Sequence, residues 1–255
     1  MLKILPIPAL TDNYIWLVIH PDNRQTIIID PSDAAPVFEA CQQYRLKPIA
    51  MLITHRHWDH VNGVQAIRQH FKIPTYAPLP FDSFPIETVS DHQVIHLFKD
   101  IPIQVFSLPG HTKAHVAYLI ENHLFCGDIL FPGACGKVED GLYHEMYNSL
   151  LEVSKMAIDT HLYPAHEYTV DTLNFAEQID PNNTLLKERL IEAFAKRQHR
   201  QPTLPVLLSD ELKTNPFLRC HEQEIKKKIA SLTHQSLDSD EAVFTALRRL
   251  KDIKG

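Results

Sequence analysis

The chain of 255 residues lacks the features that mark several classes of protein. Its 25 lysines and arginines are outnumbered by 31 aspartates and glutamates, so the net charge is −6 and the overall basic footprint of a nucleic-acid-binding protein is missing. No stretch approaches the ~20 apolar residues of a membrane helix. Residues 1–13, interrupted by Pro6 and Pro8, do not resemble a secretory signal. We therefore expect a cytoplasmic protein that binds neither nucleic acid nor membrane.

Paired cysteine motifs and internal repeats are also missing. The four cysteines, Cys41, Cys126, Cys135 and Cys220, form no CxxC pair, so a structural zinc site of the cysteine type is not indicated. Without an export signal they are expected to be reduced thiols that behave as small buried hydrophobic side chains. Repeats at solenoid periods and long exposed heptads are absent, and a monomer is the expectation.

Short apolar runs and polar turns alternate through the first two thirds of the chain, whereas the last third has helical periodicity. Strands are predicted at residues 13–20, 25–30, 49–54, 75–77, 93–98, 103–108, 116–120, 124–126 and 161–164. Helices are predicted at residues 34–46, 60–71, 145–158, 172–178, 184–198, 222–231 and 240–250. The pattern indicates a β-rich sandwich covered by helices, followed by a small helical domain.

Four candidate metal ligands, His55, His57, Asp59 and His60, come directly after a predicted buried strand. In an extended chain residues two apart project to the same side, so His55 and His57 can hold one ion together. Asp59 and His60 lie where the strand gives way to a helix and can aim at a neighbouring point. Imidazole and carboxylate suit zinc, iron and manganese, and two ions ~3.5–4 Å apart are a known catalytic arrangement.

Four side chains cannot fill two sites, and three further candidates follow other predicted strands. His111 stands in LPGHT, Asp128 in CGD and His166 in YPAH, each just after an apolar run. Strand ends converge in layered folds of strands and helices, so these three residues are predicted to complete a dinuclear site.

Taken together, these motifs resemble the metallo-β-lactamase superfamily, and within it the glyoxalase II (hydroxyacylglutathione hydrolase) family. The resemblance rests on THRHWDH (54–60), PGHT (109–112), GDILF (127–131), CGK (135–137), AHEYT (165–169), NPFLR (215–219) and RRLKD (248–252). It implies the α/β (α+β) class, with a four-layer αββα metallo-β-lactamase sandwich and a small C-terminal helical domain. The implied division is a catalytic domain at 1–165 and an α-helical substrate-binding domain at 166–255.

The resemblance also implies residue roles. One metal would lie on His55, His57 and His111, the second on Asp59, His60 and His166, with Asp128 bridging both. The cofactor would be two divalent metal ions, zinc first, with iron or manganese as options. Asp59 and Asp128 would act in catalysis together with a hydroxide shared by the ions. Lys137, Tyr168, Arg248 and Lys251 match positions that hold glutathione, whereas Glu139 departs from the family, in which an aromatic residue is common.

The implied reaction is hydrolysis of the thioester of S-(2-hydroxyacyl)glutathione, such as S-D-lactoylglutathione, in the second step of methylglyoxal detoxification. A thiolate, whose conjugate acid has a pKa of about 8.5, leaves without much help from a general acid. The strongest rival is another enzyme of this fold, such as a glutathione persulfide dioxygenase with a single iron. A β-lactamase, a nuclease and a metal-stabilised binding module are less well supported.

Overall fold

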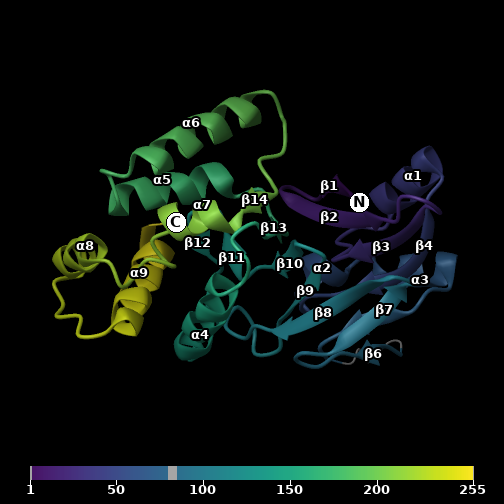
Figure 1. The fold of residues 1–255 in the computed structure, drawn as a ribbon, viewed down its shortest axis with the longest axis horizontal. Helices are drawn as coiled ribbons and strands as arrows, with labels where there is room; N and C mark the ends of the chain where they lie inside the picture. The colour runs from purple at the N-terminus through teal and green to yellow at the C-terminus, as the bar shows by residue number, and fades with distance from the viewer. Residues whose placement is uncertain (1, 80–84, 255) are drawn as a thin grey trace. The chain divides into compact units, whose positions relative to one another are not determined.

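The structure, a computed structural model, describes residues 2–79 and 85–254 (Figure 1). The chain divides into two compact units: residues Met1–Ser107 with Ala114–Gly127, and residues Leu108–Lys113 with Asp128–Gly255. The chain therefore passes from one unit to the other more than once. The boundary expected at residue 165 remains a prediction.

The first unit begins with a sheet in the order β1-β2-β3-β4-β5-β6. Its strands are β1 (Lys3–Ala9), β2 (Asn13–Ile19), β3 (Gln25–Ile29), β4 (Lys47–Leu52), β5 (Thr75–Ala77) and β6 (Glu87–Thr88). Pairing is antiparallel up to β3 and parallel from β3 to β6. Helices α1 (Ala35–Tyr44) and α3 (Val64–Phe71) pack on one face, in a cluster that includes Leu17, Val37 and Ile67. All of β2 is buried, as expected for a strand covered on both faces.

Strand β1 was not predicted from the sequence, because Pro6 and Pro8 interrupt it. In the structure it is an edge strand, which among the described strands pairs with β2 alone, with Pro6 opposite Trp16 and Pro8 opposite Tyr14. Prolines two residues apart direct their nitrogens to the same side, so both can face the open edge, where no amide hydrogen is needed.

A second, antiparallel layer of the first unit consists of β7 (Val94–Phe98), β8 (Ile101–Ser107), β9 (Val116–Ile120) and β10 (His123–Gly127). Tyr118 of β9 is fully buried, and its hydroxyl donates a hydrogen bond of 2.9 Å to the carbonyl of Ile53, just after β4. This bond fixes the second layer against the chain that leads into the histidine motif.

The helix predicted at residues 60–71 is interrupted. A short helix, α2 (Trp58–Val61), ends before Gly63, and α3 starts after it. A Cβ at Gly63 would lie 2.8 Å from the carbonyl oxygen of Pro31, and the Gly63 amide donates to that oxygen at 2.9 Å. The close approach of two backbones therefore requires glycine at this point.

The second unit is mainly helical (Figure 1). Its elements are β11 (Leu130–Phe131), β12 (Ala134–Cys135), α4 (Tyr143–Ser154), β13 (His161–Pro164), α5 (Thr169–Ile179), α6 (Thr184–Gln198), β14 (Val206–Leu207), α7 (Leu208–Thr214), α8 (Gln223–Thr233) and α9 (Asp240–Lys254). A cluster of Leu173, Ala176, Leu186 and Ala193 holds α5 against α6. The short elements β11, β12, β14 and α7 were not predicted, since each is too short to show a periodicity.

A buried polar network fixes the β11–β12 hairpin. The Asn215 amide donates to the carbonyls of Phe131 and Ala134, both at 3.1 Å, and to the Glu211 carboxylate at 2.9 Å. The Gly133 amide also donates to Glu211, at 2.8 Å, and Arg189 pairs with the same carboxylate. Buried charges are tolerated when they are paired and hydrogen-bonded in this way.

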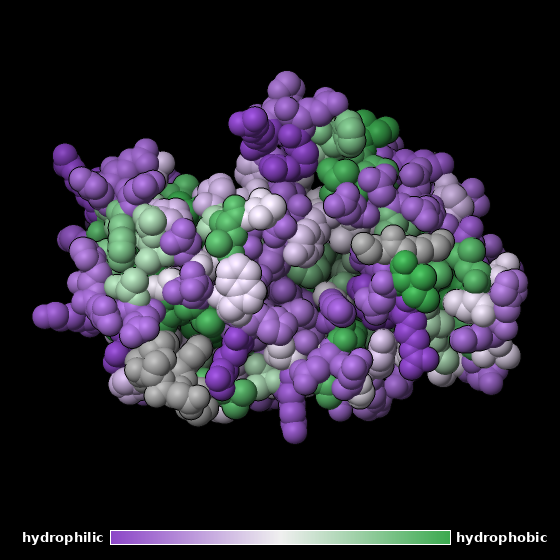
Figure 2. Space-filling model, turned by 180° about the vertical axis from the view of Figure 1, so that it is seen from behind, coloured by the Kyte–Doolittle hydropathy of each residue, from purple (hydrophilic) through white to green (hydrophobic). Residues whose placement is uncertain are grey.

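The exposed surface is dominated by polar side chains, and Figure 2 shows hydrophilic residues over much of one face with apolar ones scattered among them. The large apolar residues that are exposed include Trp58, Ile158 and Ile191. No helix in the described part of the chain is long and apolar enough to cross a membrane.

Candidate metal ligands and substrate pocket

The first unit brings His55, His57, Asp59 and His60 together after β4. The Nε2 atom of His55 lies 3.0 Å from Nδ1 of His57, and the rings of His55 and His60 have centroids 4.0 Å apart. Nε2 of His60 is 3.7 Å from Oδ2 of Asp59. His55 and His60 are fully buried, whereas His57 is exposed. The extended 54–57 segment and the turn into α2 thus place the four side chains as the spacing predicts.

Asp30, which the sequence analysis did not single out, orients two of these histidines. Its carboxylate accepts hydrogen bonds from the Thr54 amide at 2.8 Å and the Thr54 hydroxyl at 2.6 Å, and lies 3.0 Å from Nδ1 of His60. His60 therefore donates from Nδ1, which puts the lone pair of its ring on Nε2. The Thr54 hydroxyl, already a donor to Asp30, accepts from Nδ1 of His55 at 3.0 Å, with the same result. Such bonds are typical of histidines that bind metals.

Asn13 performs a similar role for Asp59. The Asn13 side chain is buried, and its amide donates to Oδ2 of Asp59 at 3.3 Å and to the Asp59 carbonyl at 3.1 Å. No sequence signal pointed to Asn13 or Asp30, because their contacts join segments 46 and 30 residues apart.

The second unit brings the other three candidates together around one carboxylate oxygen. Oδ2 of Asp128 lies 3.4 Å from Nε2 of His111 and 3.5 Å from Nε2 of His166. The Nδ1 atom of His111 lies 2.8 Å from the carbonyl oxygen of Lys137, so it donates there and the lone pair is on Nε2. Ligand atoms about 2.1 Å from one tetrahedral ion stand roughly 3.4 Å apart. The donor types and spacings of both sets therefore fit divalent metal ions.

The PGHT segment that carries His111 is held by residues 137–139. Besides the bond from His111 to Lys137, the Glu139 amide donates to the Gly110 carbonyl at 2.9 Å, and the Glu139 carboxylate accepts from the Lys113 amide at 2.9 Å. Glu139, the departure from the family pattern, is thus used in the second unit to fix the backbone on both sides of His111.

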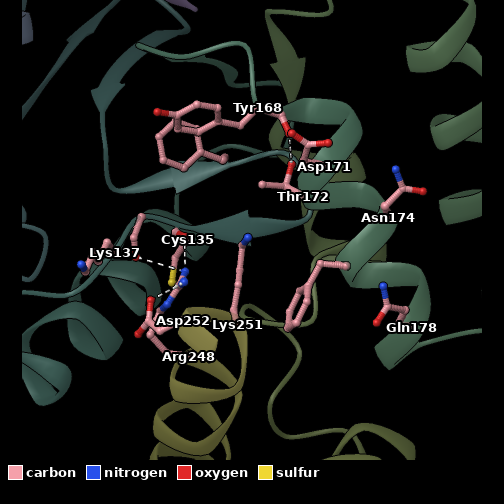
Figure 3. Close-up of a pocket in the computed structure, with 13 residues that line it drawn as sticks. Cys135, Lys137, Tyr168, Asp171, Thr172, Asn174, Gln178, Arg248, Lys251 and Asp252 are labelled. Carbon is pink, nitrogen blue, oxygen red and sulfur yellow. Dashed lines mark hydrogen bonds and ion pairs between the residues drawn. The ribbon is translucent and has the colours of Figure 1, made fainter. Parts of the chain in front are cut away.

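A cavity of about 850 Å³ lies within the second unit (Figure 3). All four of the expected glutathione-binding residues line it: Lys137, Tyr168, Arg248 and Lys251. The remaining lining residues are Phe131, Cys135, Gly136, Asp171, Thr172, Asn174, Phe175, Gln178 and Asp252. Its size lies within the usual range for small-molecule sites.

Arg248 and Lys251 give the cavity a positive wall. Arg248 is buried, and its guanidinium donates to the Cys135 carbonyl and to Asp252, both at 2.8 Å. The Lys251 ammonium lies 5.2 Å from the centre of the Phe175 ring. Burial and the charge of Arg248 lower the pKa of Lys251.

Aromatic rings connect the cavity to His166. Tyr168 lines the cavity and also contacts the ring of His166, and Phe131 lies 5.3 Å from Tyr168 and 6.2 Å from His166, measured between ring centroids. One side of the cavity is therefore formed by residues in direct contact with a candidate metal ligand.

All four cysteines are buried and free, as predicted. Burial raises the pKa of Cys41 and of Cys135 to about 11, and it raises the pKa of Cys220 still further. Since the thiolate is the reactive form, Cys135 does not supply a nucleophile to the cavity that it lines.

Similarity to known proteins extends over nearly the whole chain. Residues 10–106 match the metallo-beta-lactamase superfamily, and residues 167–253 match the family described as hydroxyacylglutathione hydrolase C-terminus. A hydroxyacylglutathione hydrolase of Alkalilimnicola ehrlichii is 40% identical over 256 residues, which is 99% of each chain. One from Aliivibrio fischeri (strain ATCC 700601 / ES114) is 40% identical over 257 residues, again 99% of each.

Solved structures share the fold at lower identity. ETHE1 from Myxococcus xanthus is similar with a TM-score of 0.66 at 18% identity, over 100% of each chain. TTHA1623 in a di-iron-bound form has a TM-score of 0.62 at 22% identity, over 84% of this chain and 100% of its own. BLEG-1, a B3 metallo-beta-lactamase, has a TM-score of 0.61 at 21% identity, over 86% and 99%.

Proposed function

The chain belongs to the hydroxyacylglutathione hydrolase family and has the metallo-β-lactamase fold with a C-terminal helical region, and on that premise we propose that it hydrolyses S-(2-hydroxyacyl)glutathione to glutathione and a 2-hydroxy carboxylate. S-D-lactoylglutathione is the expected substrate. The proposal is carried by the position of Tyr168. This residue contacts the candidate metal ligand His166 and also lines the cavity together with Lys137, Arg248 and Lys251.

Two divalent metal ions, zinc first and iron or manganese as options, are the proposed cofactor. One ion would be held by His55, His57 and His111, the other by Asp59, His60 and His166, with Asp128 shared between them. Pairs of candidate ligands within each unit support this grouping, because their donor atoms lie 3.0–3.7 Å apart. The pairs are His55–His57, Asp59–His60, His111–Asp128 and His166–Asp128. When bound, such a pair supplies Lewis acidity and lowers the pKa of a shared water.

Covalent connection supports the grouping across the two sets of ligands. A Cβ at Gly127 would lie 2.5 Å from the Thr54 hydroxyl oxygen, so the backbone of Gly127 packs against the residue that precedes His55. Asp128 follows Gly127 by one peptide bond, and consecutive Cα atoms are ~3.8 Å apart. Asp128 is therefore one peptide bond away from a residue that packs against the start of the histidine motif.

Asp59 and Asp128 are the proposed catalytic carboxylates. Asn13 fixes Asp59 so that its oxygens can orient an attacking water molecule by hydrogen bonding. Asp128, which is 7% exposed, offers a second acceptor in a largely water-excluded setting, where electrostatic effects are strong. The leaving thiolate needs no protonated side chain, because its conjugate acid has a pKa of about 8.5.

Lys137, Arg248 and Lys251 are proposed to bind the two carboxylates of the glutathione moiety, with Tyr168 beside them. Three cations around one cavity match a tripeptide with two carboxylates better than a neutral acyl group. The acyl end would extend past Tyr168 toward His166, which places the thioester carbonyl at the proposed metal ligands.

A thiol-release assay with S-D-lactoylglutathione, run beside elemental analysis of the same sample, tests the proposal. Wild-type protein should release one thiol per thioester consumed and contain close to two metal ions per chain. Oxygen uptake with glutathione persulfide, in place of thiol release, would favour the rival single-iron dioxygenase.

We also propose that the protein acts as a monomer in the cytoplasm, where reducing conditions keep its four cysteines as thiols. Analytical ultracentrifugation at micromolar concentration should give a single species near 29.3 kDa. A dimer at that concentration would contradict the first part, and localisation of a fluorescent fusion tests the second.

A further inference from the structure

One wall of the cavity has no role in the proposed reaction. Asp171, Asn174 and Gln178 all line the cavity from α5 and are exposed, whereas Leu173 and Ala176 of the same helix pack in the core. Residues three and seven positions apart share one helix face, so these three polar groups form a continuous stripe. Figure 3 shows the stripe along α5, with the Lys251 side chain of α9 extending into the space beside it.

Two aspartates, Asp171 and Asp252, line the cavity, and they differ in their partners. Asp252 is engaged by Arg248 at 2.8 Å. Asp171 makes no hydrogen bond or ion pair through its carboxylate to the other described residues, yet it is close enough to Lys251 for its negative charge to raise the lysine pKa against the larger effects of burial and Arg248. The cavity therefore presents a cation and an available carboxylate to the same space.

Glutathione carries an ammonium group as well as two carboxylates. The proposed binding residues Lys137, Arg248 and Lys251 account for the carboxylates alone, and they would repel the ammonium of the γ-glutamyl residue. An ammonium placed near cations requires an acceptor, and a carboxylate beside an amide oxygen is the acceptor that a protein can offer.

We propose that Asp171, with the amide of Asn174, forms a subsite for the α-ammonium group of the γ-glutamyl residue. Helix α5 would then bind the γ-glutamyl end of the substrate. The inference rests on the proposed function, of which it specifies the substrate recognition. In this role Asp171 determines specificity, because it favours binding of glutathione thioesters over thioesters of dianionic peptides that have no amine.

Asp171 also has a simpler explanation, since it lies in the first turn of α5, where a negative charge stabilises a helix. That role would affect thermal stability and would treat all substrates alike. Discrimination between substrates that differ only by the ammonium distinguishes the two roles.

The test compares S-D-lactoylglutathione with its des-amino analogue, in which glutaryl replaces γ-glutamyl, on the metal-loaded full chain. Wild-type protein should show a KM at least about tenfold higher for the analogue, because a charge-assisted hydrogen bond is lost. Asp171→Asn should raise KM for the parent about tenfold, leave KM for the analogue within about twofold and keep kcat for both. Glu177→Gln, which removes another carboxylate of α5 outside the cavity, is the matched control and should change neither KM.

Calorimetric titration with glutathione and des-amino-glutathione reads the same subsite without turnover. Equal affinities of wild-type protein for the two peptides, or equal losses for both in Asp171→Asn, would overturn the inference. Preserved discrimination without thiol release from the thioester would instead overturn the proposed reaction and leave the subsite in place.

Discussion

Tyr168 lies flat against His166, with ring centroids 4.7 Å apart and ring planes 6° apart. Parallel rings at this distance restrict the rotation of an imidazole, and His166 is also 3.5 Å from Asp128. Tyr168 is 37% exposed and is one of the residues that line the cavity. One side chain thus contacts a candidate metal ligand and also lines the cavity that we propose binds the substrate.

The two contributions of Tyr168 can be separated by two substitutions. Tyr168→Phe keeps the ring and should retain metal while KM rises several-fold, because only the hydroxyl is lost. Tyr168→Ala removes the ring and should also weaken metal retention during dialysis against a chelator by about tenfold, in line with losses of an outer-shell contact. Equal metal retention in the two variants would show that stacking does not orient His166.

Removal of the His57 imidazole tests the ligand set itself. His57→Ala should lose metal and nearly all thioester hydrolysis, because it removes the imidazole nitrogen that lies 3.0 Å from Nε2 of His55. His96→Ala, at an exposed histidine of β7, is the control and should keep both metal and activity. Full metal content in His57→Ala, by elemental analysis, would contradict the assignment.

Asp30 should matter although it lies outside the ligand set. Asp30→Asn keeps the shape but replaces an acceptor oxygen with a donor toward Thr54 or His60, which disturbs the order of hydrogen bonds that puts the lone pairs on Nε2. Loss of such an outer-shell partner costs about 10–100-fold in metal affinity or activity. Competition with a chromophoric chelator measures the metal affinity. An unchanged metal affinity would show that Asp30 has a structural role only.

The contacts by which Asp30, Asn13 and Glu139 hold the candidate ligands or their loop could not be predicted from the sequence. The candidate ligands could be selected from the sequence because each stands at the end of an apolar run in a motif of short spacing, and the two layers of the first unit follow from alternating apolar strands. The groups that orient the ligands have no such local signature: Asp30 reaches His60 and Asn13 reaches Asp59 only after β2, β3 and β4 have paired. Outer contacts of this kind depend on tertiary packing, which a linear pattern does not contain.

Gly136 and Asp128 approach too closely for any larger residue at 136. A Cβ added there would lie 1.8 Å from the Asp128 carbonyl oxygen and 3.5 Å from Nδ1 of His111. Gly136→Ala should therefore displace the Asp128 backbone, lower the free energy of unfolding by about 1–3 kcal/mol and reduce hydrolysis at least about a hundredfold. Gly141→Asn, at an open position with φ +86°, is the control and should have little effect. A fully active Gly136→Ala protein would show that this segment does not position Asp128.

Glu139 gives a graded prediction for the loop that carries His111. Glu139→Gln retains an oxygen that can accept from the Lys113 amide, so metal retention should fall no more than about twofold. Glu139→Ala removes the acceptor, and the loss of one hydrogen bond to a charged group at an exposed site should weaken metal retention by about three- to tenfold. Identical behaviour of the two variants would mean that the side chain does not hold the loop.

Lys251 predicts how substrate affinity depends on pH. Burial, and then the charge of Arg248, lower the pKa of Lys251 below the ordinary value of 10.5. The ammonium is present below that pKa and is lost as the pH rises through it, so KM for the thioester should increase at a lower pH than an unperturbed lysine would allow. Lys251→Arg keeps its charge across this range and should show a KM that does not change with pH, whereas Lys251→Met should have a raised KM at every pH.

Steady-state kinetics from pH 7 upward, with correction for spontaneous thioester hydrolysis, measure the effect of Lys251 on KM. An identical rise of KM in wild-type and Lys251→Arg proteins would assign the titration to another group.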